Sequence, residues 1–229
     1  MSSLPELPAA ELPPLELITP EEHRDAIGAA AELTAHALSI TRGVGGVALA
    51  HEIETTPDYL SGSTFTKFAL LAATDAEGHL ARWGRARQGK DESIRRPFNA
   101  WVDQMTDKLL IDATTNAIAN REISEGHFVY GGVVKATAAI YTARDVATSV
   151  DRAIAERQDI DTRARGSGKL KTLVQIAVTG AALTPMAKTR TGRAVLGAGF
   201  AYSAGMSLKS GRDLHRHFKE ARAAKKAAA

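Results

Sequence analysis

Two carboxylates stand four residues apart in a stretch that otherwise has an apolar, helical pattern. They are Asp103 and Asp107, within residues 99–110. On a helix this spacing puts both on one face, where they repel each other unless a cation lies between them or one stays protonated. Hard divalent cations such as Mg²⁺ bind oxygen clusters of this kind. We therefore expect a metal site here; the alternative is a solvated helix face, where acidic pairs also occur.

A second acidic stretch, residues 74–82, precedes the first. At about 100° per residue, a helix would place five of its residues on one face: Thr74, Glu77, Gly78, Ala81 and Arg82. Asp75 would lie at the edge of that face. It could reach a metal shared with the other stretch only if the helix is locally overwound or underwound.

Together the two stretches resemble the signature of the CDP-alcohol phosphatidyltransferases. That signature is Asp-x-x-Asp-Gly-x-x-Ala-Arg, followed after a spacer by Gly-x-x-x-Asp-x-x-x-Asp. The positions that match in type and spacing are Gly78, Ala81, Arg82, Asp103 and Asp107. The chain departs from the signature at the first two acids, where Glu77 replaces the second Asp and Thr74 or Asp75 replaces the first. The spacer is longer than is usual in the family, and Asn99 replaces its Gly.

A later segment supports the same resemblance. Residues 168–175 read Gly-Lys-Leu-Lys-Thr-Leu-Val-Gln, which is similar to the start of the family's fifth helix, and Arg144 is followed by an acid, as in the family. The order of elements is most similar to that of the phosphatidylglycerophosphate synthases, the branch that uses glycerol 3-phosphate. A phosphate loop is not indicated, because its Gly-x-x-x-x-Gly-Lys-Ser/Thr spacing and a preceding strand are both missing.

The resemblance implies a reaction in which an alcohol attacks the lipid phosphate of CDP-diacylglycerol and CMP leaves, with Mg²⁺ or Mn²⁺ neutralising the phosphate oxygens. It implies that Asp107 is the general base and that the metal ligands are Asp75, Glu77, Asp103 and Asp107. It assigns the CDP group to Gly78, Ala81 and Arg82, and the acceptor phosphate to Arg144, Lys169 and Lys171. The alternative for these last three is a set of helix-end cations that face solvent.

The resemblance also implies an all-α fold, namely a bundle of six transmembrane helices with the active site facing the cytoplasm and a possible homodimer. Hydropathy favours a different class of protein. The mean hydropathy is -0.16, and the longest charge-free runs, 172–187 and 194–208, are shorter than the roughly 20 residues that span a bilayer. By periodicity alone the chain would be a soluble helical protein. With the resemblance, we expect a multi-pass membrane protein with membrane lipid as a partner.

Composition excludes a few classes of site. The chain has no Cys, which excludes disulfides and thiolate zinc sites. Aromatic residues make up only 5% of the chain and no nucleic-acid-binding motif occurs, so we expect no nucleic-acid partner. The net charge of +3 fits a protein that works beside anionic lipids or phosphate substrates.

The chain divides into a Pro-rich tail at 1–20, which we expect to be disordered, a helical domain at 21–210, and a frayed basic tail at 211–229. Within the domain the pattern predicts helices at 21–31, 36–50, 65–87, 97–120, 126–157, from 168 to about 183, and 192–210. Glycines predict close helix packing at Gly43, Gly45, Gly46, Gly131 and Gly132.

Two other functions remain open. The chain could be a family member that kept the fold but lost full activity and has a structural or binding role, which the altered acidic positions favour. It could also be a soluble helical interaction module whose motif matches are coincidental.

Overall fold

The protein is helical throughout the part that the computed structural model describes, which is residues 20–74, 77–88, 97–158, 160 and 166–228. The elements are α1 (Pro20–Thr55), α2 (Gly62–Ala73), α3 (Glu77–Arg87), α4 (Pro97–Ser124), α5 (Phe128–Glu156), α6 (Gly166–Ala182), the 3-10 helix η2 (Pro185–Lys188) and α7 (Arg190–Ala228). The prediction of an all-α fold is confirmed. The prediction of six helices is wrong, because the described residues form seven α-helices.

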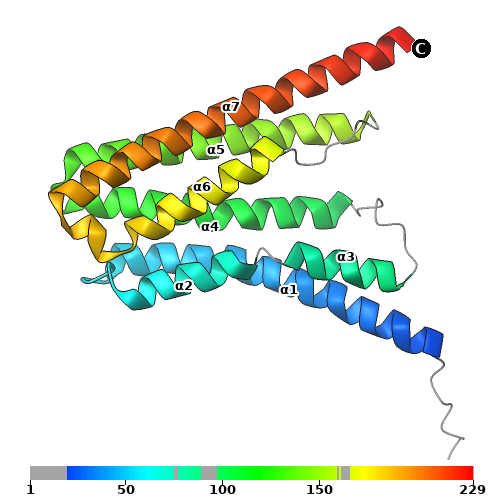
Figure 1. Cartoon of the computed structure of the whole chain (residues 1–229), viewed down its shortest axis with the longest axis horizontal. Coiled ribbons are helices and arrows are strands. Elements are labelled where there is room, and N and C mark those ends of the chain that lie inside the picture. The colour runs from blue at the N-terminus through cyan, green and yellow to red at the C-terminus, as the bar shows by residue number, and fades with distance from the viewer. Residues whose placement is uncertain (1–19, 75–76, 89–96, 159, 161–165, 229) are drawn as a thin grey trace, which may run out of the picture.

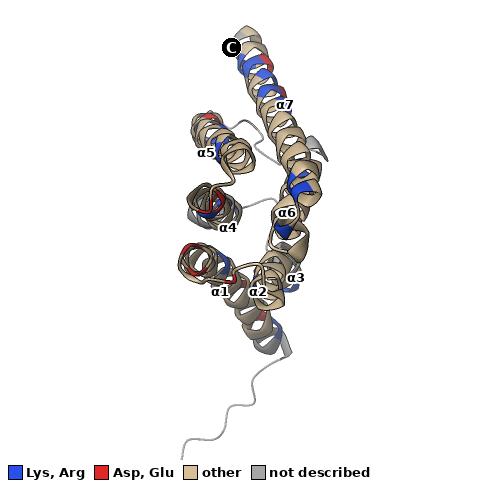
Figure 2. Ribbon diagram, turned by 90° about the vertical axis from the view of Figure 1, so that its left-hand side faces the viewer, with Lys and Arg blue, Asp and Glu red and all other residues tan. Residues whose placement is uncertain are grey.

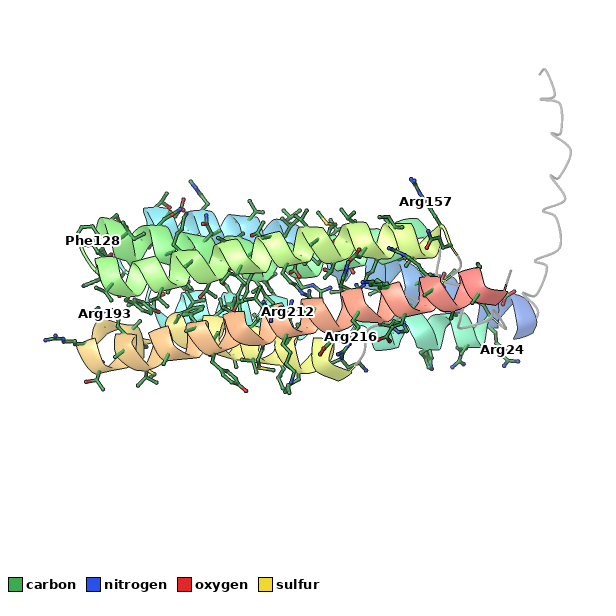
Figure 3. All side chains as sticks on the ribbon, turned by 90° about the horizontal axis from the view of Figure 1, so that it is seen from above. Arg24, Phe128, Arg157, Arg193, Arg212 and Arg216 are labelled. Carbon is green, nitrogen blue, oxygen red and sulfur yellow. The ribbon has the colours of Figure 1, made fainter. Side chains whose placement is uncertain are left out.

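The helices form two layers that run along the long axis of the molecule (Figure 1). Figure 2 shows α1, α4 and α5 stacked in one layer, and α2, α3, α6 and α7 in the other. Contacts of α4 with α6 and of α5 with α7 join the layers. The side chains of Phe128 and Arg193 mark one end of the bundle, and those of Arg24 and Arg157 mark the other (Figure 3).

Glycines on α1 let this helix approach two neighbours closely. A Cβ atom at Gly46 would lie 2.6 Å from the Cα atom of Leu110 on α4, and one at Gly45 would lie 2.6 Å from a side-chain carbon of Leu71 on α2. Contacts this short are closer than real Cβ atoms come. A larger residue at Gly46 would push α1 and α4 apart, because the obstructing atom is backbone, whereas at Gly45 the end of the Leu71 side chain would have to shift. The predicted close packing is confirmed at Gly43, Gly45, Gly46 and Gly131, but it is wrong for Gly132, where a Cβ atom would have nothing within 4 Å.

The helix boundaries differ from the predicted ones in three places. Segments 21–31 and 36–50 belong to one helix, α1, because Ala31 and Ala35 continue a single buried face across the gap. Segment 65–87 forms two helices: α2 ends at Ala73, where the Thr74 hydroxyl donates to the Leu71 carbonyl (2.7 Å), and α3 begins at Glu77.

The third difference is the basic tail. The prediction that it is frayed is wrong for residues 211–228, since α7 continues without a break to Ala228. Leu214 and Phe218 lie beyond the predicted end at residue 210, and both are buried against Ala155 of α5. This apolar contact provides the packing that an isolated basic helix would lack.

A short turn joins α4 to α5. Gly126 has a φ of 86°, which is the left-handed conformation that commonly ends a helix and that glycine adopts without strain. The amide of Gly126 donates to the Ile123 carbonyl (3.0 Å), and the amide of His127 donates to the Glu122 carbonyl (2.8 Å). The turn therefore satisfies the last carbonyls of α4 and reverses the chain into an antiparallel hairpin.

The interior of the bundle is partly polar. An apolar core around Ile53, Phe68, Ile118 and Phe200 is fully buried, but many Ser and Thr side chains and several charged ones are buried as well. Large apolar side chains are exposed on the outside, among them Leu33, Val44, Val129 and Leu173. Within the described ranges, no helix combines the length and the apolar character that crossing a membrane requires.

Candidate functional site

The acidic residues of the predicted metal site lie mainly outside the described part of the structure. Asp75 is outside it altogether. For five further predicted residues the structure describes only the helix backbone: Glu77, Gly78, Arg82, Asp103 and Asp107. Ala81, on α3, is partly buried. Among the described side chains, no group of three His, Asp or Glu could hold a metal, so the Mg²⁺ or Mn²⁺ site stays a prediction.

The two helices that carry the acidic stretches share one neighbour. Both α3 and α4 pack against α1. The α1–α3 contact is close, because a Cβ atom at Gly84 would lie 2.7 Å from the carbonyl oxygen of Gly28. The fold thus holds the backbones of both stretches against a single helix.

A charged cluster lies inside the bundle where α4, α5 and α6 meet. Its members, here called the Asp145 cluster, are Lys108, Asp112, Arg144, Asp145 and Lys171. Asp145 is 5% exposed and Lys171 is 6% exposed. One Asp145 carboxylate oxygen pairs with Arg144 and lies 3.5 Å from Lys171 Nζ. Lys108 Nζ donates to the Asp145 backbone carbonyl at 3.0 Å.

Hydroxyl groups accept further hydrogen bonds from the basic side chains of this cluster. Lys108 Nζ also donates to Ser149 Oγ at 2.7 Å, and Arg144 Nη2 donates to Ser210 Oγ of α7 at 3.1 Å. The Nε atom of Arg144 is buried and has no hydrogen-bond partner. Basic side chains from three helices therefore converge, and at least one of their N–H donors, Arg144 Nε, has no acceptor.

Burial and neighbouring charges shift the pKa values of the ionisable groups in this cluster. Burial acts to raise the pKa of Asp145, but Lys171 and Arg144 hold it below the usual range. Burial, with the charge of Asp145, raises the pKa of Asp112 to about 7. Burial lowers the pKa of Lys108 to about 8, against the attraction of Asp145. It also lowers the pKa of Lys171.

Basic groups outnumber acidic ones in the Asp145 cluster at neutral pH. The low pKa of Asp145 keeps that carboxylate ionised, while the raised pKa of Asp112 leaves it partly protonated near neutrality. Three basic side chains thus face two carboxylates, one of them partly protonated, and the lowered pKa values of Lys108 and Lys171 show that their charged forms are disfavoured here as well. Buried like charges repel strongly in a medium of low dielectric constant. An anion that binds among them would relieve this repulsion.

The structure brings together two of the three residues predicted for the acceptor phosphate. Arg144 and Lys171 meet at Asp145, whereas Lys169 is exposed on α6. Sequence reasoning missed Lys108 and Asp112 as site residues. The available signal was their spacing of four on α4, which puts both on one helix face.

A second buried carboxylate lies near the opposite end of α4. Glu122 is 1% exposed, and its Oε1 atom accepts a hydrogen bond of 2.6 Å from the Tyr59 hydroxyl. Its Oε2 atom lies 2.8 Å from His127 Nδ1, although the angles miss those of a hydrogen bond. Burial and the hydrogen bond to Glu122 raise the pKa of Tyr59. These three residues are called the Glu122 cluster below; they tie the α1–α2 connection to the α4–α5 turn.

The Asp145 cluster is thus the described site best suited to bind a ligand, and its chemistry suits an anion. It offers a planar guanidinium and two ammonium groups in a largely dry interior, which is a set of donors typical of phosphate sites. Comparison with known proteins adds no family to this geometry: no family model, no curated protein and no solved structure matches the chain.

Proposed function

We propose that the protein is a phosphatidyltransferase of the CDP-alcohol type. It moves a phosphatidyl group from CDP-diacylglycerol to a phosphorylated alcohol, with glycerol 3-phosphate as the favoured acceptor, and releases CMP in phospholipid biosynthesis. The observation that carries the proposal is the excess of basic side chains in the Asp145 cluster. A bare alcohol such as serine or inositol would not need such a group of cations, whereas a phosphate dianion would neutralise it.

The position of the cluster on α4 supports the proposal. Lys108 directly follows Asp107, the proposed general base, and its Nζ atom reaches the Asp145 carbonyl on α5. The acceptor phosphate and the base would therefore lie within one to two helix turns of each other on α4. An alcohol bound by its phosphate at Arg144 and Lys171 would have its hydroxyl held close to α4, which favours reaction through proximity.

A divalent metal suits the residues proposed to hold it. All four are carboxylates, which fit Mg²⁺ or Mn²⁺ better than a soft metal: Asp75, Glu77, Asp103 and Asp107. When bound, such a metal neutralises phosphate oxygens and the leaving group. Gly78, Ala81 and Arg82 are proposed to hold the CDP group beside it.

A lipid donor implies that the protein works at a membrane. Large apolar side chains are exposed along the outer side of α1, among them Leu33 (71%) and Val44 (66%). Burying such side chains in lipid is favourable, so they support contact with the membrane that supplies CDP-diacylglycerol. We expect the protein in the membrane fraction, with the site open to the cytoplasm.

The first test measures CMP release from CDP-diacylglycerol by the purified protein with Mg²⁺ and a panel of acceptors. We expect release with glycerol 3-phosphate. Asp103→Asn and Asp107→Asn should each abolish it, because one removes a metal ligand and the other the base. Use of serine or free inositol in place of glycerol 3-phosphate would contradict the assigned acceptor. Absence of release with every acceptor would leave the protein as a binding or structural relative.

A matched pair of lysines tests the phosphate site itself. Each charged phosphate contact is worth roughly 1.5–3 kcal/mol. Lys171→Ala should therefore raise the KM for glycerol 3-phosphate at least about tenfold, with little change for CDP-diacylglycerol. Lys169→Ala, two residues away on the exposed side of α6, should leave both constants unchanged. Equal effects of the two substitutions would remove the Asp145 cluster from the acceptor site.

A further inference from the structure

Only one carboxylate oxygen of Asp112 accepts a hydrogen bond. Its Oδ2 atom accepts a hydrogen bond of 3.1 Å from the Thr142 hydroxyl of α5. Its Oδ1 atom is buried and has no hydrogen-bond partner. A buried acceptor without a donor is unfavourable for folding. An acceptor oxygen left in this state, next to a group of cations, indicates that a ligand supplies the missing donor.

The surroundings of Asp112 limit what this ligand can be. Thr142, the partner of Asp112, precedes Asp145 by three residues, so these two residues of α5 are about one helix turn apart on one side of the helix. Lys108 and Lys171 act on Asp112 electrostatically, as does Asp145. A ligand that reaches both Asp112 and the basic side chains must therefore present a donor a few bonds away from an anion.

We propose that Asp112 Oδ1 accepts a hydrogen bond from a non-reacting hydroxyl of the acceptor, and so determines specificity for a polyol phosphate. The proposal rests on the proposed function, because it names a contact of that same acceptor. A three-carbon polyol phosphate carries a phosphate for Arg144 and Lys171 and, on the neighbouring carbon, a hydroxyl for Asp112. An ammonium group in this place would be repelled by the lysines, and a methylene group would leave Oδ1 unpaired.

The expected selectivity is large. A site that hydrogen-bonds a substrate hydroxyl disfavours the analogue that lacks it, because the buried polar group is then left without a partner. We expect the protein to bind glycerol 3-phosphate at least about tenfold more tightly than 3-hydroxypropyl phosphate. The two ligands share the phosphate and one terminal hydroxyl, and they differ only in the hydroxyl at the central carbon.

The experiment measures the dissociation constants of both phosphates by calorimetric titration of the whole protein, without CDP-diacylglycerol. Asp112→Leu replaces the carboxylate with an apolar side chain of similar size and should abolish the preference. Asp112→Asn keeps one acceptor oxygen and should keep part of the preference. Asp58→Asn, an exposed acid at the other end of the bundle, is the control and should keep the full preference.

The outcomes separate this inference from the proposed function. An unchanged ratio in Asp112→Leu, or an equal loss of affinity for both ligands, would overturn the specificity role. If Asp112→Leu does not fold, as judged by circular dichroism, an unchanged ratio in Asp112→Asn and Asp112→Ala overturns it. A lost preference in a protein that releases no CMP with any acceptor would keep the hydroxyl contact and reject the transferase reaction. No binding of either phosphate would overturn the inference.

Discussion

The Asp145 cluster and the Glu122 cluster each bury a carboxylate between helices, but they are completed in different ways. Glu122 has a neutral donor in Tyr59 and a half-exposed His127 beside it. Asp145 has basic groups from three helices around it, and its neighbour Asp112 keeps an unpaired oxygen. Both occur in the same bundle, so burial alone does not distinguish a structural polar cluster from a binding site.

The difference lies in the balance of charge, since both clusters contain buried polar atoms without a hydrogen bond. A structural cluster gains stability when its charge is matched and its hydrogen bonds are made. A binding site keeps an excess of charged side chains of one sign, which lowers the stability of the protein until a ligand binds. By this criterion the Glu122 cluster fixes the end of the bundle, and the Asp145 cluster receives a ligand. The predictions below test this division.

The largest effect is expected from Asp145→Asn. This substitution removes the negative charge that the buried basic groups share, and leaving buried charges uncompensated costs about 3–5 kcal/mol. The free energy of unfolding, measured by denaturant titration, should fall by that amount. Asp151→Asn is the control: its partner His215 is largely exposed, so the cost should stay below about 1 kcal/mol. A gain in stability from Asp145→Asn would show that Asp145 does not balance the cluster.

A smaller effect is expected from Tyr59→Phe in the Glu122 cluster. The substitution leaves Glu122 Oε1 buried without its donor, which costs about 1.5–3 kcal/mol for a hydrogen bond to a charged group. The melting temperature should fall, while the KM for the acceptor phosphate should not change. Tyr202→Phe on the exposed side of α7 should change neither quantity. A raised KM in Tyr59→Phe would contradict the purely structural role of this cluster.

The smallest effect is a dependence of stability on pH through Asp112. Its pKa in the folded protein is about 7, above the ordinary value of 3.8 for an Asp side chain. The folded state therefore binds more protons than the unfolded state between these values, and stability falls as the pH rises from about 4 to 7. Since water reaches part of Asp112, we expect the loss to be only about 1 kcal/mol.

The measurement compares the wild type with Asp112→Asn at pH 5 and pH 8. The wild type should lose more unfolding free energy between the two pH values than the variant does. The same slope in both proteins would mean that Asp112 is not protonated in the folded state at pH 5, and it would weaken the contrast between the two clusters.

Much of the fold is predictable because the helix signals are local. The all-α class and the approximate extents of α4, α5 and α6 agree with the structure. The break after Ala73 and the continuation of α7 past residue 210 were not predicted. The continuation of α7 depends on tertiary packing, since Phe218 packs against Ala155 of α5, and local propensity does not contain this information.

The site is predictable to a smaller extent. The resemblance brought attention to Arg144 and Lys171, and the structure places both at Asp145. Helical spacing shows that Lys108 and Asp112 share a face, but it does not show which helix that face meets. Lys169 and Lys171 belong to one motif, but residues two apart on a helix point in different directions, so only Lys171 reaches the cluster.

The turn at Gly126 has a consequence for the order of folding. It makes α4 and α5 a hairpin, so Lys108 and the Asp145 carbonyl meet across 37 residues, whereas Tyr59 and Glu122 meet across 63. Closing the longer loop costs about 0.5 kcal/mol more in chain entropy. Local contacts also form faster than distant ones. The charged site therefore begins to assemble within one hairpin, before the first helix closes the end of the bundle.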